Sequence, residues 1–233
     1  REAWKDMASH PVGTHRVNVF NPAFRADGVR ATDVTVVEVV NDNMPFLVDS
    51  VMAELQDSGL EVRLVLHPIL MVERDEDGKM IACHGKFTGA EKKNVRKESL
   101  IHIHVARIDA EIERSGLMER MDGVMNDVRR AVTDWTDMRG RLQRAISTYK
   151  ESPPPFAADD LAEAVQFLEW MEADNFILLG MREYHFEGGA QRGELSHKEG
   201  TGLGLLKDPD VRVLRRGSEF VVMTPEIREF LMK

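Results

Sequence analysis

The sequence is poor in cysteine, in long apolar runs and in positive charge. Cys83 is the single cysteine among 233 residues, so no internal disulfide framework is available, and a reducing compartment suits the chain. No apolar run approaches the roughly 20 residues that a membrane-spanning helix needs. The formal net charge of −9 argues against nucleic acid or an anionic membrane as the main partner.

Motifs that carry catalysis are also missing. The sequence has no phosphate-binding P-loop, no convincing Ser/His/Asp order and no paired carboxylates in a recognisable setting. The run Gly200–Gly204 has the spacing of a dinucleotide-binding loop, but Leu205 takes its sixth position and no hydrophobic strand leads into it. We therefore expect no catalytic residue and no cofactor within this chain.

The composition is that of a globular protein, with 42% hydrophobic and 30% charged residues. A length of 233 residues is enough for one large domain or two small ones. The chain begins at Arg1 rather than at methionine and stops inside a helical pattern. We therefore expect it to be part of a longer protein.

The most informative stretch is Asn41–Ser50, which joins a β-branched run to an apolar helical pattern. It predicts a central strand over 33–41, a tight turn and a helix over 45–58. Pro45 suits the first turn of this helix, because its missing N–H costs nothing there. Gly59 suits the C′ position that ends it.

Free backbone N–H groups at such a helix start can bind a carboxylate or a phosphate. The turn can equally be well capped and bind nothing. If it does bind an effector, the residues predicted to form the site are Asp42, Asn43, Met44, Pro45, Phe46 and Leu47.

Strict alternation over Ser99–Ile108 predicts a strand that carries two histidines on one face. The spacing His102-x-His104 is that of a partial metal site. A third ligand is not evident in the sequence, so two histidines on a half-exposed strand face are the alternative interpretation. We predict no metal site on this basis.

The second half of the chain is dominated by a long helical pattern and a proline run. Apolar residues over 117–149 predict one helix of about 50 Å, with Gly123 and Gly140 as points where it can bend or break. Ser152-Pro153-Pro154-Pro155 predicts a stiff linker. The predicted organisation is a lead-in segment 1–30, an α+β domain 31–150, a linker 151–158 and a second, incomplete module 159–233.

The order strand, helix, strand, hairpin, strand, helix over 33–150 is the ferredoxin-like βαββαβ plan, and the 41–50 turn resembles the first turn of ACT domains. Three motifs extend the resemblance over most of residues 33–206: Asn41–Ser50; Asp127-Val128-Arg129 with Ala131-Val132 and Asp134-Trp135; and Asn175-Phe176 with Leu179-Gly180-x-Arg182-Glu183-Tyr184. In order and spacing they are similar to the N-terminal region of the large bacterial NAD-specific glutamate dehydrogenases.

This resemblance implies a very long, cytoplasmic, homo-oligomeric parent enzyme that deaminates L-glutamate to 2-oxoglutarate with NAD bound outside this chain. The chain itself would be a regulatory and assembly region, with an ACT-like domain followed by an α/β, PAS-like sensor module. Its implied partners are further copies, met through sheet edges or the long helix, the catalytic domains of the same chain, and a small amino-acid effector.

One residue departs from the pattern of amino-acid-binding ACT domains. These domains typically have glycine after the proline of the first turn, which lets a ligand approach the backbone. Phe46 stands at this position here, and its side chain can fill the space of a ligand. A purely structural oligomerisation module without a ligand is therefore the alternative function.

Overall fold

The computed structural model divides the chain into two compact units, residues 1–128 and 129–233, which are considered separately below. The residues that it describes are 7–22, 25–26, 29–30, 33–86, 95–188, 193–211 and 220–221. Both units combine helices with antiparallel strands, so the predicted α+β class is confirmed. Over these residues, no helix has the length and apolar character to cross a membrane.

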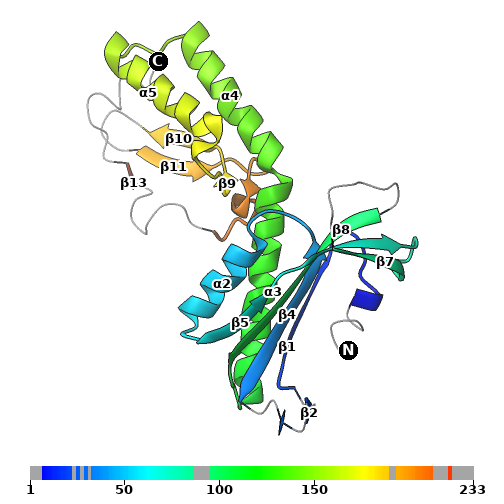
Figure 1. Cartoon of the computed structure of the whole chain (residues 1–233). Helices are drawn as coiled ribbons and strands as arrows, with labels where there is room; N and C mark the ends of the chain where they lie inside the picture. Colours follow the sequence, from blue (N-terminus) through cyan, green and yellow to red (C-terminus); the bar gives the residue numbers. More distant parts are fainter. Residues whose placement is uncertain are drawn as a thin grey trace. The chain divides into compact units, whose positions relative to one another are not determined.

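The first unit is built on a six-stranded antiparallel sheet with the order β1-β4-β8-β6-β7, in which β5 also pairs with β8 (Figure 1). A separate short pair is formed by β2 and β3. The strands are β1 (His15–Phe20), β2 (Arg25–Ala26), β3 (Val29–Arg30), β4 (Val34–Asp42), β5 (Val62–Leu66), β6 (Ile69–Arg74), β7 (Met80–Lys86) and β8 (Val95–Ala106).

The core of this unit joins one sheet face to two helices, α2 (Leu47–Asp57) and α3 (Glu111–Thr133). Strand β4 is central because its β-branched residues are buried on both faces. Alternate residues of β8 and residues three to four apart on the helices are almost fully buried, as two-residue and 3.6-residue periods require. They include Leu47, Val51, Leu55, Ile101, Ile103, Val105, Leu117, Met121 and Met125.

Helix α2 begins two residues later than predicted. Pro45 lies outside the helix, and Phe46 precedes it with φ +69°, in the left-handed region. The predicted end is confirmed: Gly59 has φ +67°, and the N–H groups of Gly59 and Leu60 donate to carbonyl groups of the last turn. This pattern is a Schellman motif, which satisfies carbonyl groups that would otherwise lack donors.

The predicted lead-in segment is part of the first unit. Strand β1 pairs with β4 along its whole length, and Met7 is buried against Val40 and Val72. Strand β1, which occupies one side of β4, therefore precedes α2 in the sequence. The predicted βαββαβ plan instead places its last strand after the second helix. The sequence pattern did not place β1 in this sheet, because β1 is only half-buried and forms a strand through its hydrogen bonds to β4.

The predicted helix 117–149 is two helices, α3 and α4 (Trp135–Glu151), and the break falls at Asp134 rather than at Gly123 or Gly140. Asp134 has φ −91° and ψ 2°, and its buried carboxylate accepts hydrogen bonds from Gly204 N and Lys207 Nζ. The break between α3 and α4 therefore coincides with tertiary hydrogen bonds of Asp134 and not with a glycine. The boundary between the two units lies inside α3, after residue 128.

The second unit contains two packed helices and short antiparallel strands. Leu142 and Ile146 of α4 pack against Val165 of α5, which spans Ala158–Trp170. The remaining elements are a π-helical turn η1 (Met171–Asn175), β9 (Gly180–Met181), β10 (Tyr184–Gly188), β11 (Gly193–His197), β12 (Leu203–Gly204), the 3-10 helix η2 (Leu205–Lys207) and β13 (Phe220–Val221). The strands form two sheets, β10-β11-β13 and β12-β9.

The proline run does not separate two compact units. It connects α4 to α5 inside the second unit, because both helices share the apolar cluster just described. The predicted linker 151–158 is thus a connection between packed helices. The sequence also predicts a strand over 211–214 and a helix after Pro225, and both fall mainly outside the described residues.

Candidate functional site

The predicted effector turn is held mainly by its own polar groups. Asp42, at the end of β4, accepts a hydrogen bond from Gly13 N at 2.8 Å. Asn43 N donates to Lys97 O at 2.9 Å. Both interactions fasten the turn to neighbouring segments, so these two residues have a structural role.

The rest of the turn leads into α2. Leu47 is 2% exposed and belongs to the core, while Met44 and Phe46 are half-buried and Pro45 is exposed. In the part of the chain that the structure describes, no side chain caps the start of α2. The six predicted residues therefore form one continuous turn that leads into α2.

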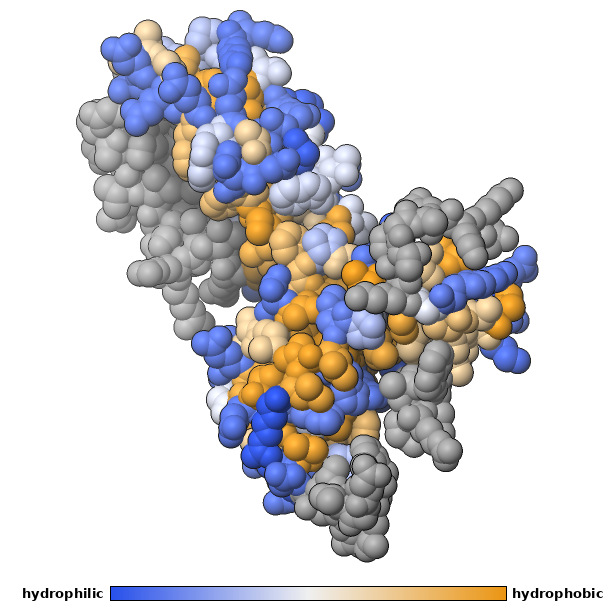
Figure 2. All heavy atoms as spheres, in the orientation of Figure 1, coloured by the Kyte–Doolittle hydropathy of each residue, from blue (hydrophilic) through white to orange (hydrophobic). Residues whose placement is uncertain are grey.

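A shallow pocket of about 440 Å³ lies along α2 and extends past the end of this helix. It is lined by Asp49, Met52, Ala53 and Gln56 of α2, and by Leu60 and Val62. Strand β5 continues from it with exposed apolar side chains: Leu64, Val65 and Leu66 are 40%, 39% and 51% exposed. Figure 2 shows apolar surface over α2 and β5. The sequence analysis did not predict this exposed apolar surface.

The two histidines of β8 share a sheet face, as the alternation predicted. His102 Nδ1 is 2.7 Å from Glu38 Oε1, and His102 Nε2 is 2.9 Å from His104 Nε2. Glu38 is 3% exposed. Within the described parts of the chain, no group of three or more His, Cys, Asp or Glu side chains is placed to hold a metal. The arrangement is a carboxylate–imidazole–imidazole chain of hydrogen bonds.

The pKa of His104 lies below its usual value of 6.5, because burial and then the nearby charge of His102 disfavour its protonated form, against the attraction of Glu38. Burial also lowers the pKa of His67. An unfolded chain takes up these protons near pH 6.5, whereas the folded protein takes them up only at lower pH. The stability that depends on these two groups is therefore present above pH 6.5 and is lost as the pH falls from 6.5 through their folded pKa values.

His104→Gln is expected to flatten the loss of stability between pH 7.5 and about pH 5.5. Glutamine keeps a hydrogen-bonding side chain but does not titrate, so one source of proton uptake on unfolding is removed. Urea unfolding at several pH values measures the effect. The control is His84→Gln, on a histidine that is 35% exposed. An unchanged pH slope in His104→Gln would show that this imidazole does not contribute.

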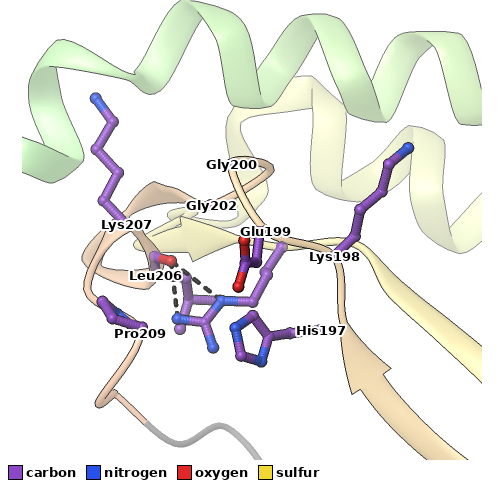
Figure 3. Close-up of a pocket in the computed structure, with 9 residues that line it drawn as sticks. His197, Lys198, Glu199, Gly200, Gly202, Leu206, Lys207 and Pro209 are labelled. Atoms are coloured by element: carbon purple, nitrogen blue, oxygen red, sulfur yellow. Dashed lines mark hydrogen bonds between the residues drawn. The ribbon is translucent and has the colours of Figure 1, made fainter.

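The second unit holds a pocket of about 450 Å³ that sequence reasoning missed (Figure 3). Its lining residues come from the end of β9, the turn after β11 and the segment around η2: Arg182, His197, Lys198, Glu199, Gly200, Gly202, Leu206, Lys207 and Pro209. Two features of the sequence could have pointed to this pocket: Arg182, within the third motif, and the glycine run 200–204.

Two glycines of that run allow close backbone packing. A Cβ on Gly202 would lie 2.1 Å from Leu206 O, and one on Gly204 would lie 2.2 Å from Leu179 O. Gly204 also has φ +58°, which favours glycine. The glycine spacing thus reflects how β12 and η2 pack on β9, in agreement with the rejection of a dinucleotide-binding loop.

An antiparallel sheet with a turn and a helix after its central strand places the first unit in the class of ACT-like α+β domains. Residues 1–121 match the family described as "Glutamate dehydrogenase, ACT1 domain". The chain therefore belongs to this family, and the resemblance drawn from the three motifs is confirmed.

Similar proteins include three with the name NAD-specific glutamate dehydrogenase. The one from Halomonas elongata is 32% identical over 227 residues, covering 92% of this chain and 14% of the relative. The one from Pseudomonas aeruginosa is 29% identical over 215 residues, covering 92% and 13%. The one from Mycobacterium tuberculosis is 26% identical over 175 residues, covering 73% and 10%. The chain thus spans a small part of the length of each relative.

Proposed function

We propose that this chain is the regulatory and assembly region of a large NAD-dependent glutamate dehydrogenase. The observation that carries the proposal is the ACT1 family match over residues 1–121, together with relatives of that name of which the chain spans 14% or less. The parent would convert L-glutamate, NAD and water into 2-oxoglutarate, ammonia and NADH. NAD and the catalytic residues would lie outside this chain, on the catalytic domains of the parent protein. This region would be a partner of those domains.

For regulation, we propose that the start of α2 receives a small amino-acid effector, with Asp42 to Leu47 around it. The uncapped first turn supports this, because its N–H groups carry partial positive charge. The φ of +69° at Phe46 also supports it, since the backbone there has the conformation that glycine adopts easily. The phenyl ring limits access to the same place.

Phe46→Gly is expected to strengthen amino-acid binding at this turn, because it removes the ring and relieves about 1–2 kcal/mol of left-handed strain. NMR titration with glutamate, following the backbone amides of Leu47 and Val48, locates the binding. Phe46→Ala is the matched control, because it removes the ring but keeps the strain. If the two amides do not shift in any of the three proteins, the effector site is wrong and assembly remains as the role of this unit.

For assembly, we propose that β5 pairs with β5 of a second copy. The outer edge of β5 has no strand partner among the described residues, and an exposed apolar edge is a template for pairing with another strand. An antiparallel pair with its two-fold axis at Leu64 places Val62 of each copy opposite Leu66 of the other, so apolar side chains meet. The same contact covers Leu64 and the pocket beside α2.

The double variant Leu64→Lys/Leu66→Lys is expected to weaken self-association about 100-fold, because it places charge on the apolar edge and removes area that pairing would bury. Sedimentation velocity across a dilution series of the protein measures this. Ile112→Lys is the control, on an apolar side chain that is 81% exposed at the start of α3. Equal dissociation of the two variants, or none in either, would contradict pairing through β5.

For the second unit, we propose a sensor module of PAS-like type. Its support is architectural: a small antiparallel sheet, β10-β11-β13, accompanied by the packed helices α4 and α5. A sensor module requires a place for a ligand, and the pocket at Arg182 is a candidate.

A further inference from the structure

The pocket of the second unit has walls that are fixed before any ligand arrives. Arg182 donates from Nε and Nη2 to Leu206 O at 3.1 and 2.8 Å, and from Nη2 to Asp208 O at 2.6 Å. The dashed lines in Figure 3 mark the two bonds to Leu206. On the opposite wall, Lys198 N donates to Glu183 O at 2.9 Å, and the Thr201 hydroxyl donates to Lys198 O at 2.7 Å.

The two lysines of the lining do not direct their charge into the pocket. Lys207 Nζ is 2.8 Å from Asp134 Oδ1 and Lys198 Nζ is 3.3 Å from Glu183 Oε2, so each has a carboxylate partner elsewhere. Figure 3 shows both ammonium ends pointing away from the pocket centre. Among the described lining residues, the charges left to act on a ligand are those of Arg182 and Glu199, and the His197 ring adds hydrogen-bonding nitrogens.

Arg182 has hydrogen-bonding capacity in reserve. Its acceptors are carbonyl oxygens of three residues, and Nη1 makes only a long contact of 3.4 Å to Val211 O. A guanidinium has five N–H donors, so at least one Nη1 hydrogen has no acceptor among the described residues. No carboxylate in the described parts of the chain forms an ion pair with it. This half-buried cation suits an oxyanion, and the His197 ring lines the same pocket.

Glu199 supplies the opposite charge. Its carboxylate has no hydrogen bond or ion pair with the described residues, and Glu199 lines the same pocket as His197 (Figure 3). The volume of about 450 Å³ is within the usual range for small-molecule sites. On the walls of this pocket, a cation and a carboxylate that each form no ion pair with the described residues are complementary to a molecule that carries both an acidic and a basic group.

We propose that this pocket binds a small zwitterion of the free amino-acid class, with its carboxylate on Arg182 and His197 and its ammonium group on Glu199. The inference goes beyond the proposed function, because it assigns a ligand to the second unit rather than to the ACT-like turn. A simple anion site is the competing outcome, and the ammonium group separates the two.

Isothermal titration of the whole chain with glutamate, 2-oxoglutarate and inorganic phosphate tests the proposal. 2-Oxoglutarate keeps both carboxylates of glutamate but lacks the ammonium group. We expect glutamate to bind at least about tenfold more tightly than 2-oxoglutarate, and Glu199→Gln to remove that preference. The NMR signal of the His197 ring should shift on binding, which places the ligand in this pocket rather than at α2.

Glu163→Gln is the matched control, because Glu163 is exposed on α5 away from the lining residues. His197→Gln serves as a second variant, on an exposed side chain, and is expected to weaken binding about tenfold without affecting folding. Equal affinity for glutamate and 2-oxoglutarate, binding of phosphate alone, or no binding would each overturn the proposal. None of these results would affect the tests at Phe46 or β5.

Discussion

Arg74→Met is expected to lower the free energy of unfolding of the first unit by about 3–5 kcal/mol, the usual cost of leaving one partner of a buried ion pair alone. Arg74 and Glu98 have side chains that are each 1% exposed. The guanidinium donates from Nη2 to Glu98 Oε2 at 2.7 Å, and also to the carbonyl oxygens of Met7 and Gly78. Its removal leaves the buried Glu98 carboxylate without its cation and takes one donor from the carbonyl oxygen of Met7, whereas Gly78 O keeps the hydrogen bond from His10 N.

The pKa of Glu98 reports how strongly this pair favours the charged carboxylate. Burial alone would raise that pKa, but the hydrogen bonds and charges of Arg74 and His10 hold it below its usual value. The stability contributed by the carboxylate is therefore present above the unfolded pKa and is lost as the pH falls through the folded value. In Arg74→Met, only His10 is left to oppose the effect of burial on the carboxylate, so the variant loses stability at neutral pH.

Urea unfolding of Arg74→Met against the unchanged protein measures the effect. The matched control is Arg63→Met, because Arg63 forms exposed pairs with Asp33 and Glu61 and such pairs contribute at most about 1 kcal/mol. The double variant Arg74→Met/Glu98→Leu should recover more than half of the loss, because no unpaired charge remains. A loss in Arg74→Met no larger than in Arg63→Met would refute the argument.

Gly204→Ala is expected to destabilise the second unit by about 3 kcal/mol or more, from left-handed strain together with overpacking. The added Cβ would lie 2.2 Å from the carbonyl oxygen of Leu179, which belongs to the backbone and cannot rotate away. The φ of +58° adds strain for any residue with a Cβ. Gly204 N must also keep its hydrogen bond to Asp134 Oδ2, so the segment has little freedom to move.

Gly200→Ala is the control for this variant. Gly200 has φ +73°, but a Cβ there would meet no atom within 4 Å, so only the strain of about 1–2 kcal/mol applies. Chemical unfolding followed by the fluorescence of Trp135 and Trp170, both in the second unit, compares the two. Equal stability of the two variants would show that the close approach seen at Gly204 does not limit packing.

Features with a local physical cause were predictable from sequence. Gly59 ends α2 because a left-handed residue there needs no Cβ, and alternation along β8 placed His102 and His104 on one face. The apolar run of β4 predicted a strand buried on both faces. The hydrophobic periodicity does not indicate a family. The three motifs did, because they predicted that this region belongs with glutamate dehydrogenases.

Features that depend on distant residues were not predictable in this way. The pairing of β1 with β4 is one such feature. The helix break at Asp134 involves a hydrogen bond to Gly204, seventy residues further along the chain. The left-handed conformation of Phe46 is unusual for an aromatic residue, so sequence rules placed Pro45 inside the helix. The pocket at Arg182 needs three separate segments.

The pairing of β4 with β8 determines when the first unit can fold. Val34 lies opposite Ala106, so the central pair of the sheet joins segments far apart in sequence, whereas β6 and β7 are joined by a short turn. Non-local pairs form slowly because a long loop must close first. During synthesis, β4 and α2 emerge long before β8 and must wait with apolar faces uncovered. This interval is when the nascent chain is most open to misassembly.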